Sequence, residues 1–415
     1  MIVERVGLDG DGIGRLAEGS AAYLPLTLPG ERVAARPLTR RGEGWACVAE
    51  VLEPSAERVV PPCPLFGACG GCALQHWADA PYAAWKTGLA GAATAPLART
   101  PAAARRRIEL ALRRAPGRVL VGLHRRSSPE VVDMRTCPIL DPRLFEVVAG
   151  LRGMLPGLEA LRREGSASLN LLDTGPDLLL RTDAALSAAD RSRLAAWARE
   201  QKVPRVCWAR GAGVPEVAVQ HGPATIRLGP GHVAPPPGAF LQASAAGEAA
   251  IRAAVLAALP ASLPRRAKIV ELYAGCGTLT FALAERARVV AYEGDAGAVA
   301  AVRRAGFARV DMIQRDLTRQ PLQAREFAGA SAVVLDPPWT GAGLQMVTLA
   351  AAGVPVIVYV SCNPVALARE AAPLLAAGYG VEALTPVDQF LWSARVEAVA
   401  VFRQRTAASS SMERA

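Results

Sequence analysis

The stretch Glu271-Leu-Tyr-Ala-Gly275-Cys276-Gly277-Thr278 decides the fold of this chain. It overlaps the end of an apolar run, Ile269–Leu272, and leads into a helical run, Leu279–Arg286. A strand, a glycine turn and a helix form the first unit of a nucleotide-binding fold. The glycines at 275 and 277 allow the backbone to approach a ligand closely. We therefore expect a ligand-binding loop at this position.

Similar units follow along the chain. Apolar runs at 289–292, 332–335 and 356–360 alternate with helical stretches, a pattern that predicts βα units and a parallel sheet. The runs are almost continuously hydrophobic, as strands buried on both faces are. Residues 261–405 are thus predicted to form a Rossmann-like α/β domain.

Acidic residues around the loop indicate which ligand it takes. Glu293 follows the second strand, where a carboxylate can accept hydrogen bonds from both ribose hydroxyls. Asp316 is expected to meet the adenine edge, and Tyr273 to line the same site. The third glycine that a dinucleotide pyrophosphate needs is missing. An acidic residue, Glu271, just before G-x-G suits a cationic sulfonium, so S-adenosylmethionine is the predicted cofactor.

Two further segments are expected at strand ends, where open α/β sheets place their active sites. They are Leu335-Asp336-Pro337-Pro338-Trp339-Thr340-Gly341 and Tyr359-Val-Ser361-Cys362-Asn363-Pro364. A cysteine followed by Asn-Pro belongs in a turn, so we interpret Cys362 as a nucleophile. Glu397 starts a later strand-like run, and if it faces the cofactor it can serve as a general base.

With these pieces the chain resembles the RNA 5-methyluridine (uracil-C5) methyltransferase family. The matching segments are Glu271–Thr278, Leu335–Gly341, Ser361-Cys362-Asn363-Pro364, Asp388 through Glu397, and Pro237-Gly-Ala-Phe240-Leu-Gln242-Ala. The similarity covers the chain up to its tail. It implies a class I methyltransferase domain that acts on carbon 5 of uracil in RNA.

The resemblance also implies a mechanism. Carbon 5 of uracil is too weak a nucleophile to attack a methyl sulfonium unaided. Cys362 would add to carbon 6 and so activate carbon 5, and Glu397 would later remove the carbon-5 proton. Gln242 and Asp336 would line the pocket and hold the base or the cofactor. The target base must leave its stack to be reached.

Two positions depart from the family pattern. Trp339 stands where many members have arginine after Asp-Pro-Pro, and Arg395 stands where they often have histidine two residues before the base. The first change is expected to alter a contact to RNA or substrate. The second is expected to favour the ionised form of Glu397, because an arginine close to a carboxylate does so.

A cysteine cluster stands upstream, in Cys63-Pro-Leu-Phe-Gly-Ala-Cys69-Gly-Gly-Cys72, and Cys137 is the candidate for a fourth ligand. All-thiolate ligation fits either zinc or an iron–sulfur cluster, and the spacing hardly separates them. The family resemblance implies a [4Fe–4S] cluster, structural or RNA-positioning in role. Cys47 and Cys207 are expected in the core.

The N-terminal residues 1–57 predict a small β-barrel, because short apolar stretches alternate with glycine turns. Its segments Gly10–Gly14 and Leu28–Val33 resemble the TRAM RNA-binding domain found in these enzymes. Basic residues at Arg36, Arg40 and Arg41 would contact phosphates. The whole chain carries a net charge of +10, which favours a nucleic-acid partner.

Between barrel and catalytic domain, residues 58–260 are expected to form a central α+β domain that includes the cysteine cluster. The tail, 406–415, is predicted to be disordered. No signal peptide or membrane-spanning run is present in the sequence, so we expect a cytoplasmic protein without a membrane partner. Nothing suggests an obligate oligomer, and a monomer is expected.

Several alternatives stay open. Ribosomal RNA is favoured over transfer RNA, because a TRAM domain together with the cluster is typical of the ribosomal branch. RNA cytosine-C5 methylation also uses a cysteine, but those enzymes usually carry a Thr-Cys or Pro-Cys element. A non-catalytic RNA-binding protein is disfavoured by the presence of Cys362 and Glu397.

Overall fold

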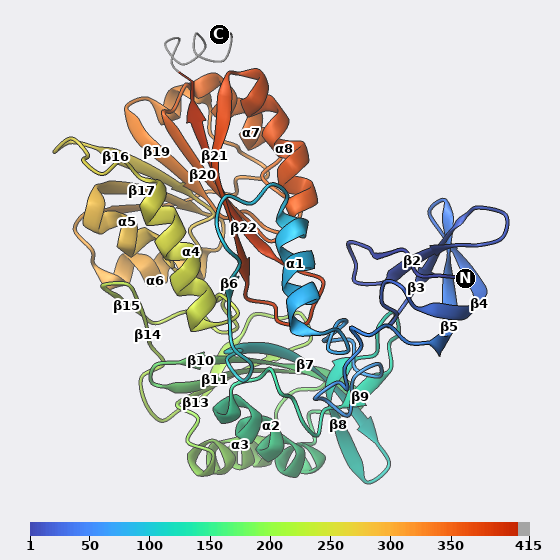
Figure 1. Cartoon of the computed structure of the whole chain (residues 1–415). Coiled ribbons are helices and arrows are strands. Elements are labelled where there is room, and N and C mark those ends of the chain that lie inside the picture. Colours follow the sequence, from blue (N-terminus) through green and yellow to red (C-terminus); the bar gives the residue numbers. More distant parts are fainter. Residues whose placement is uncertain (406–415) are drawn as a thin grey trace.

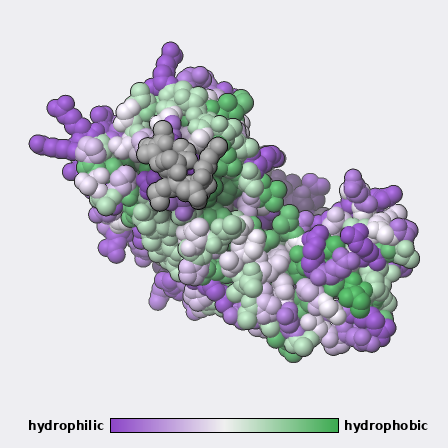
Figure 2. All heavy atoms as spheres, turned by 45° about the horizontal axis from the view of Figure 1, so that its top comes forward, coloured by the Kyte–Doolittle hydropathy of each residue, from purple (hydrophilic) through white to green (hydrophobic). Residues whose placement is uncertain are grey.

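The computed structural model describes residues 1–405, and the predicted disordered tail lies outside them. The chain builds three large sheets, which Figure 1 shows as a small N-terminal lobe, a central lobe and a C-terminal lobe. No helix within the described residues is long and apolar enough to cross a membrane. Hydrophilic and hydrophobic residues intermingle over the face seen in Figure 2.

The C-terminal sheet has the predicted Rossmann-like architecture. In spatial order its strands are β18 (Val310–Gln314), β17 (Arg288–Glu293), β16 (Lys268–Leu272), β19 (Ala330–Leu335), β20 (Val356–Ser361), β22 (Glu397–Gln404), β21 (Tyr379–Asp388) and β6 (Ala98–Arg99). The first five run parallel, and β22 is antiparallel to both of its neighbours. The α/β fold class predicted for this domain is therefore confirmed. None of the apolar runs in the sequence indicated β18, because this strand lies at the edge of the sheet and has only one buried residue.

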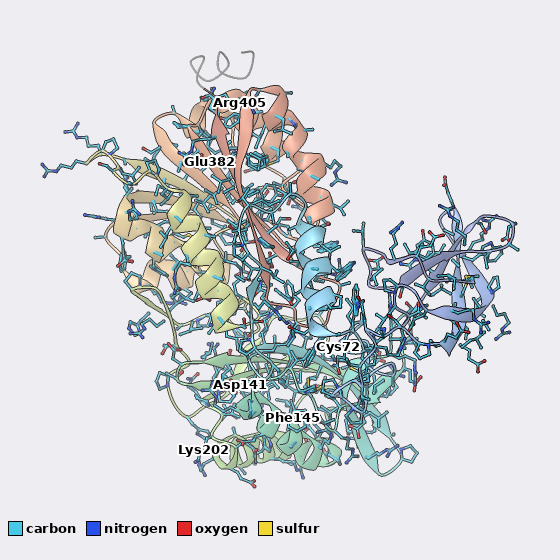
Figure 3. All side chains as sticks on the ribbon, in the orientation of Figure 1. Cys72, Asp141, Phe145, Lys202, Glu382 and Arg405 are labelled. Atoms are coloured by element: carbon cyan, nitrogen blue, oxygen red, sulfur yellow. The ribbon has the colours of Figure 1, made fainter. Side chains whose placement is uncertain are left out.

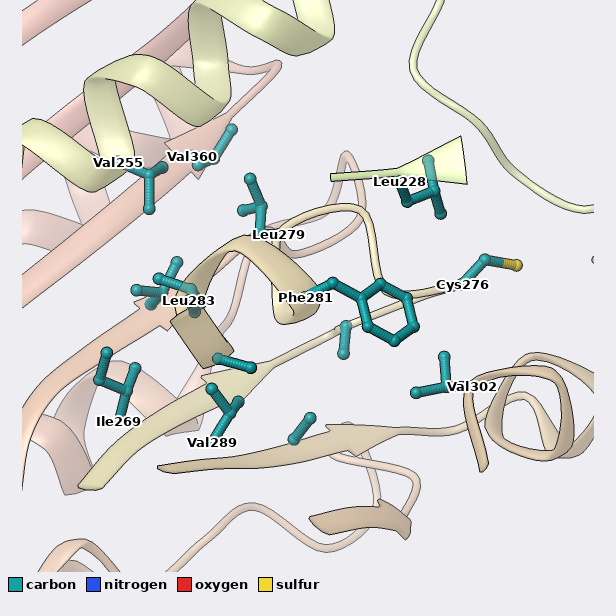
Figure 4. Packing of buried hydrophobic residues seen from close by; sticks show 14 of the residues in the cluster. Leu228, Val255, Ile269, Cys276, Leu279, Phe281, Leu283, Val289, Val302 and Val360 are labelled. Carbon is teal, nitrogen blue, oxygen red and sulfur yellow. The ribbon is translucent and has the colours of Figure 1, made fainter. Parts of the chain in front are cut away.

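Helices cover both faces of this sheet, because its strand residues alternate between two cores. One core joins the sheet to α4 (Ala245–Ala258), α5 (Thr280–Arg286) and α6 (Ala296–Ala305). The other joins it to η2 (Ala324–Phe327), α7 (Leu344–Ala352) and α8 (Pro364–Ala376). Figure 4 shows the first core, where Phe281 at the start of α5 lies between Leu228 and the strand residue Val289.

Two elements from far upstream complete the C-terminal lobe. Helix α1 (Asp79–Ala90) packs against β21, and β6 pairs with the end of β21 through Val387 and Asp388. The sequence assigns these segments, like α4, to the central part of the chain. Their place is set by partners nearly 300 residues away, and β6 itself is only two residues long.

The central sheet has helices packed on one face. In spatial order its strands are β13 (Glu216–Gln220), β12 (Arg205–Arg210), β11 (Gly175–Thr182), β10 (Glu164–Leu172), β7 (Arg107–Ala115), β8 (Arg118–His124) and β9 (Val131–Asp133). Its core is closed by α2 (Pro142–Met154), η1 (Leu155–Gly157) and α3 (Ala188–Glu200). A small hairpin, β14 (Ile226–Leu228) with β15 (Gly231–Val233), packs its β15 strand against α6.

The N-terminal sheet curls until its ends meet. Its strands are β1 (Arg5–Val6), β2 (Gly12–Arg15), β3 (Ala21–Leu24), β5 (Gly44–Glu53) and β4 (Arg32–Arg41). Backbone bonds from Val33 N to Met1 O (2.8 Å) and from Val3 N to Glu31 O (2.9 Å) join the first residues to the start of β4. This closure gives the barrel-like shape that the turn spacing predicts.

Candidate active site

The glycine loop (residues 273–278) leaves the end of β16 in a conformation that few side chains tolerate. Gly275 and Gly277 both have positive φ, at 54° and 91°. A Cβ on Gly277 would lie 2.5 Å from the ring of Phe281, so this position needs glycine, whereas the space beside Gly275 is open. Tyr273 also has a positive φ, 61°, which costs strain in a residue that is not glycine.

Carboxylates surround this loop without a cation to balance them. Glu271 is 2% exposed, and its Oε2 has no hydrogen-bond partner in the described part of the chain. Burial raises the pKa of Glu271 to about 8, and the charges of Asp336 and Glu293 add to that rise. Glu293, at the end of β17, accepts from Gly275 N at 2.8 Å. The site is therefore suited to a ligand that brings positive charge.

Asp316 lies two residues after the end of β18, the strand that pairs with β17. Its side chain is half exposed, and its Oδ1 accepts from the Thr318 backbone N–H at 3.0 Å. It therefore lies at the same edge of the sheet as Glu293, and its other oxygen, Oδ2, lies 3.5 Å from Arg319 Nε. Cys276, by contrast, is buried in the apolar core (Figure 4).

A chain of buried amides and carboxylates runs from the cofactor side of the site to Glu397. Gln242 Nε2 donates to Asp336 Oδ2 at 3.0 Å, and its Oε1 accepts from Gln389 Nε2 at 2.7 Å. Gln389 Nε2 also donates to Glu397 Oε1 at 2.8 Å. Sequence reasoning missed Gln389, although it directly follows Asp388 in a segment that matched the family. Its amide links Gln242 and Glu397, which the sequence predicted separately.

Glu397 is the first residue of β22, and its side chain is buried. Burial raises its pKa, and the nearby charge of Asp336 raises it further. The Arg395 guanidinium stacks on the Trp339 ring, 3.6 Å from the centroid, and keeps its charge there. That Arg395 favours the ionised form of Glu397 therefore stays a prediction. A carboxyl with a raised pKa is a stronger base once it is ionised.

Cys362 lies in the turn between β20 and α8. Asn363 caps the helix by accepting from Ala366 N at 3.2 Å, and Pro364 follows as its first residue. Burial raises the pKa of the Cys362 thiol to about 12, and the charges of Glu397 and Asp336 raise it as well. The strand register places Glu397 beside this cysteine, because Ser361 of β20 pairs with Ala398 of β22, and Cys362 and Glu397 are the next residues at the same end of the pair. In the ligand-free chain the thiol is protonated.

The four predicted cluster cysteines, Cys63, Cys69, Cys72 and Cys137, line one cavity of about 340 Å³. Figure 3 shows Cys72 below the start of α1, where the three lobes meet. Gln75 Oε1 accepts from Cys63 N at 3.1 Å, and this amide also hydrogen-bonds to the Cys72 thiol. Within residues 1–405 no three His, Cys, Asp or Glu side chains converge closely enough to hold a single metal ion. The other two cysteines are also buried, Cys47 in the core of the N-terminal sheet and Cys207 in β12 of the central sheet.

The basic residues of the N-terminal sheet differ in whether acidic side chains already pair with them. Arg36 and Arg40 are exposed. Arg41 instead donates to Asp11 Oδ2 at 2.6 Å and to Asp9 Oδ2 at 2.7 Å. The ion pairs compensate the charge of Arg41, so the predicted phosphate contacts are left mainly to the other two arginines.

Comparisons with known proteins match this architecture. The family model described as tRNA (Uracil-5-)-methyltransferase matches residues 238–405. An uncharacterized RNA methyltransferase of Caulobacter vibrioides is 39% identical over 97% of this chain and 99% of its own length. The 23S rRNA (uracil(1939)-C(5))-methyltransferase RlmD of Alkalilimnicola ehrlichii is 36% identical over 91% of this chain and 90% of its own.

A solved structure shares the whole fold. It is the tRNA (uracil-54, C5)-methyltransferase of Pyrococcus abyssi in complex with S-adenosyl-L-homocysteine. The TM-score is 0.71 at 20% identity, and the match covers 97% of this chain and 99% of that one. The likeness therefore extends beyond the C-terminal sheet to the other lobes.

Proposed function

Since the chain belongs to the RNA uracil-C5 methyltransferase family, we propose that it methylates a uridine of 23S ribosomal RNA with S-adenosylmethionine as methyl donor. The relative from Alkalilimnicola ehrlichii supports ribosomal RNA, because it is named for that substrate and resembles this chain over most of its length. Transfer RNA is the competing substrate, since the matching family model is described for it.

The closeness of Cys362 to Glu397 carries this proposal. Ser361 pairs with Ala398 across β20 and β22, so Cys362 and Glu397 follow at the same end of neighbouring strands. Gln389 holds the Glu397 carboxylate by a 2.8 Å hydrogen bond. A nucleophile and a base that lie side by side are what carbon-5 substitution of a pyrimidine needs. Neither residue alone would distinguish this reaction from other methyl transfers.

The proposed cofactor fits the residues of the glycine loop. The buried Glu271 carboxylate has an unpartnered oxygen, and Asp336 and Glu293 add negative charge beside it. The cationic sulfonium and ammonium groups of S-adenosylmethionine would offset this charge. Gly275, Gly277 and Tyr273 would line the adenosyl and methionyl parts, and Asp316 would face the adenine. When bound, the cofactor supplies the methyl group.

The protein residues then have separate roles. Cys362 Sγ forms a bond to carbon 6 of uracil, which makes carbon 5 nucleophilic enough to accept the methyl group. Glu397 takes the proton from carbon 5, and the Cys362–carbon 6 bond breaks to restore the aromatic ring. Gln242 and Asp336 orient the base at one end of the amide–carboxylate chain.

Cys362 must react as a thiolate, whereas the ligand-free site keeps it protonated. Two of the causes of its raised pKa are the negative charges of Asp336 and Glu397. A positive ligand beside these carboxylates lowers the thiol pKa, because an opposite charge favours an ionised group and cancels the repulsion. The nucleophile is therefore expected to become reactive only in the loaded enzyme.

We also propose that the four-cysteine cavity holds a [4Fe–4S] cluster. The four cysteines line one space of about 340 Å³. Four thiolates are the ligand set that such a cluster takes. Its role would be structural, since methyl transfer needs no electrons.

Trapping with 5-fluorouridine tests the chemistry. Fluorine at carbon 5 cannot leave as a cation, so RNA carrying it should form a stable covalent complex with the enzyme and S-adenosylmethionine. Cys362→Ala should form none, while Cys207→Ala, a cysteine far from the site, should form it normally. Normal trapping by Cys362→Ala would refute the nucleophile.

Mapping in cells tests the substrate. RNA from a deletion strain, digested and analysed by mass spectrometry, should lack one 5-methyluridine in 23S ribosomal RNA. Loss of the modification from transfer RNA instead would move the proposal to the competing substrate. Loss of a 5-methylcytidine would overturn the choice of base.

A further inference from the structure

The two departures from the family pattern contact each other. Arg395 places its guanidinium 3.6 Å from the centroid of the Trp339 ring, and the Trp339 side chain is still 43% exposed. The Trp339 carbonyl accepts from Asn363 Nδ2 at 3.2 Å, so the indole is tied to the turn that carries Cys362.

A cavity of about 240 Å³ opens beside this pair. Its walls include Leu8, Asp9, Leu89, Trp339, Cys362 and Arg395. None of the members of the buried amide–carboxylate chain, from Gln242 to Glu397, lines it. The target uracil must lie between Cys362 and Glu397, and of these two only Cys362 lines the cavity, so the cavity adjoins the target position at the sulfur.

One wall of the cavity comes from the N-terminal lobe. Leu8, 60% exposed, stands in the turn before β2. Arg126, from the β8–β9 connection, holds this turn by donating to Asp11 Oδ2 at 3.0 Å and to Asp9 O at 3.3 Å. The barrel is therefore fixed over the catalytic turn, and Leu8 faces the same space as Trp339. Arg41 neutralises Asp9, which leaves Arg395 as the dominant charge.

We propose that this cavity binds the base of the nucleotide next to the target uridine, which stacks on Trp339 and is covered by Leu8. The inference rests on the proposed function, because it assumes an RNA with one base already extruded. Flat bases stack on aromatic rings and on guanidinium planes in single-stranded RNA. An unstacked target leaves its neighbour without a stacking partner, and Trp339 would replace that partner.

The charge of the site supports an RNA occupant over a peptide or a metabolite. Arg395 is the unpaired cation of the cavity, and the chain carries a net charge of +10. A phosphate between the two nucleotides would pass close to Arg395, where a charge-assisted contact positions the strand without reading its sequence. Stacking and phosphate contact together would hold the target uridine in line with Cys362.

Binding of short RNAs by the full-length protein tests this inference. The probe is a fluorescein-labelled single-stranded 11-mer with one central uridine, and two versions lack the base either 5′ or 3′ of that uridine. Dissociation constants are measured by fluorescence anisotropy at one salt concentration, because salt changes them strongly. The variants are Trp339→Ala, Trp339→Phe and the surface control Val214→Ala, with circular dichroism to establish that each is folded.

For the wild type we expect about tenfold weaker binding when one of the two neighbours is abasic. Trp339→Ala should bind the intact RNA about tenfold more weakly and lose this discrimination, while Trp339→Phe and Val214→Ala should keep it. If Trp339→Ala discriminates as the wild type does, the inference is wrong. Methyl transfer to the same RNAs is measured separately, so that absence of methylation counts against the proposed function and leaves the stacking result intact.

Discussion

Lys86 Nζ lies 2.9 Å from Asp388 Oδ1, and both side chains are completely buried. The pair joins α1 to the end of β21, directly before Gln389. Tyr82 OH donates to the other carboxylate oxygen at 2.7 Å, and Lys86 also donates to the carbonyls of Phe390 and Arg395. A single ammonium group thus holds both ends of the connection between Gln389 and Glu397.

Replacing Lys86 should therefore affect both stability and catalysis. Lys86→Met leaves the Asp388 carboxylate buried without a cation, which costs about 3–5 kcal/mol of unfolding free energy. The double variant Lys86→Met, Asp388→Asn should recover part of that loss, since no charge is left unpaired. Urea denaturation measures the free energy, and Lys202→Met, at an exposed lysine, is the control. Equal stability of Lys86→Met and Lys202→Met would contradict the role of the pair.

Removing the base should slow release of the covalent intermediate more than its formation. Glu397→Gln keeps the hydrogen bond to Gln389 but cannot accept the carbon-5 proton, so turnover should fall by about 10²–10⁴-fold. The adduct with ordinary uridine RNA should accumulate on denaturing gels. Glu382→Gln, a surface carboxylate paired with Arg403 and far from the site, should behave as wild type (Figure 3). Unchanged turnover of Glu397→Gln would exclude it as the base.

Binding of S-adenosylmethionine should release protons. The pKa of Glu271 is raised to about 8, so most of this carboxyl is protonated at pH 7 and ionises when a cation arrives. Calorimetry in two buffers of different ionisation enthalpy measures the number released. S-adenosylhomocysteine, which lacks the sulfonium charge, should release fewer. Equal release by the two ligands would count against a charge-compensating role for Glu271.

The raised pKa of the Glu271 carboxyl can also be tested without any ligand. Its pKa is raised from 4.5 to about 8 on folding, so the folded chain binds more protons than the unfolded chain between these values. Stability should therefore fall as pH rises from about 4.5 to about 8. Glu271→Gln should show a shallower fall over this window, measured by urea denaturation at each pH.

Iron content tests the four-cysteine cavity. The wild type should be brown after purification and contain iron and acid-labile sulfide. Cys137→Ser should lose most of both, because it removes one ligand of the set. Cys47→Ala, at a cysteine in the barrel core, should keep them. A colourless wild type with one zinc per chain would replace the cluster with a single-metal site.

Local signals in the sequence predict residues that the fold then brings to one edge of a sheet. Gly275, Gly277 and Cys362 each follow a strand, and parallel strands deliver such residues to one edge of the sheet. Gln389 could not be found this way, because its role depends on side-chain contacts across the site. The contact of Arg395 with Trp339 is likewise tertiary, because the two residues are far apart in the sequence.

The division of the chain into lobes was harder to predict than the site. Helix α1 carries Lys86 into the C-terminal lobe, and β6 lengthens its sheet by a pairing with residues almost 300 positions later. A two-residue strand has no periodicity to recognise. Its position follows from the open edge of β21, which only the folded sheet provides.

Helix α1 and strand β6 both contact β21, and this arrangement limits how such enzymes can be truncated or recombined. Residues 238–405, which match the family model, do not contain the partner of Asp388 or the strand that covers β21. A catalytic fragment cut at that boundary would have a buried unpaired carboxylate and an uncovered edge. The N-terminal and central lobes of two relatives therefore cannot be exchanged as independent units. A chimera has to carry α1 and β6 from the same parent as its methyltransferase sheet.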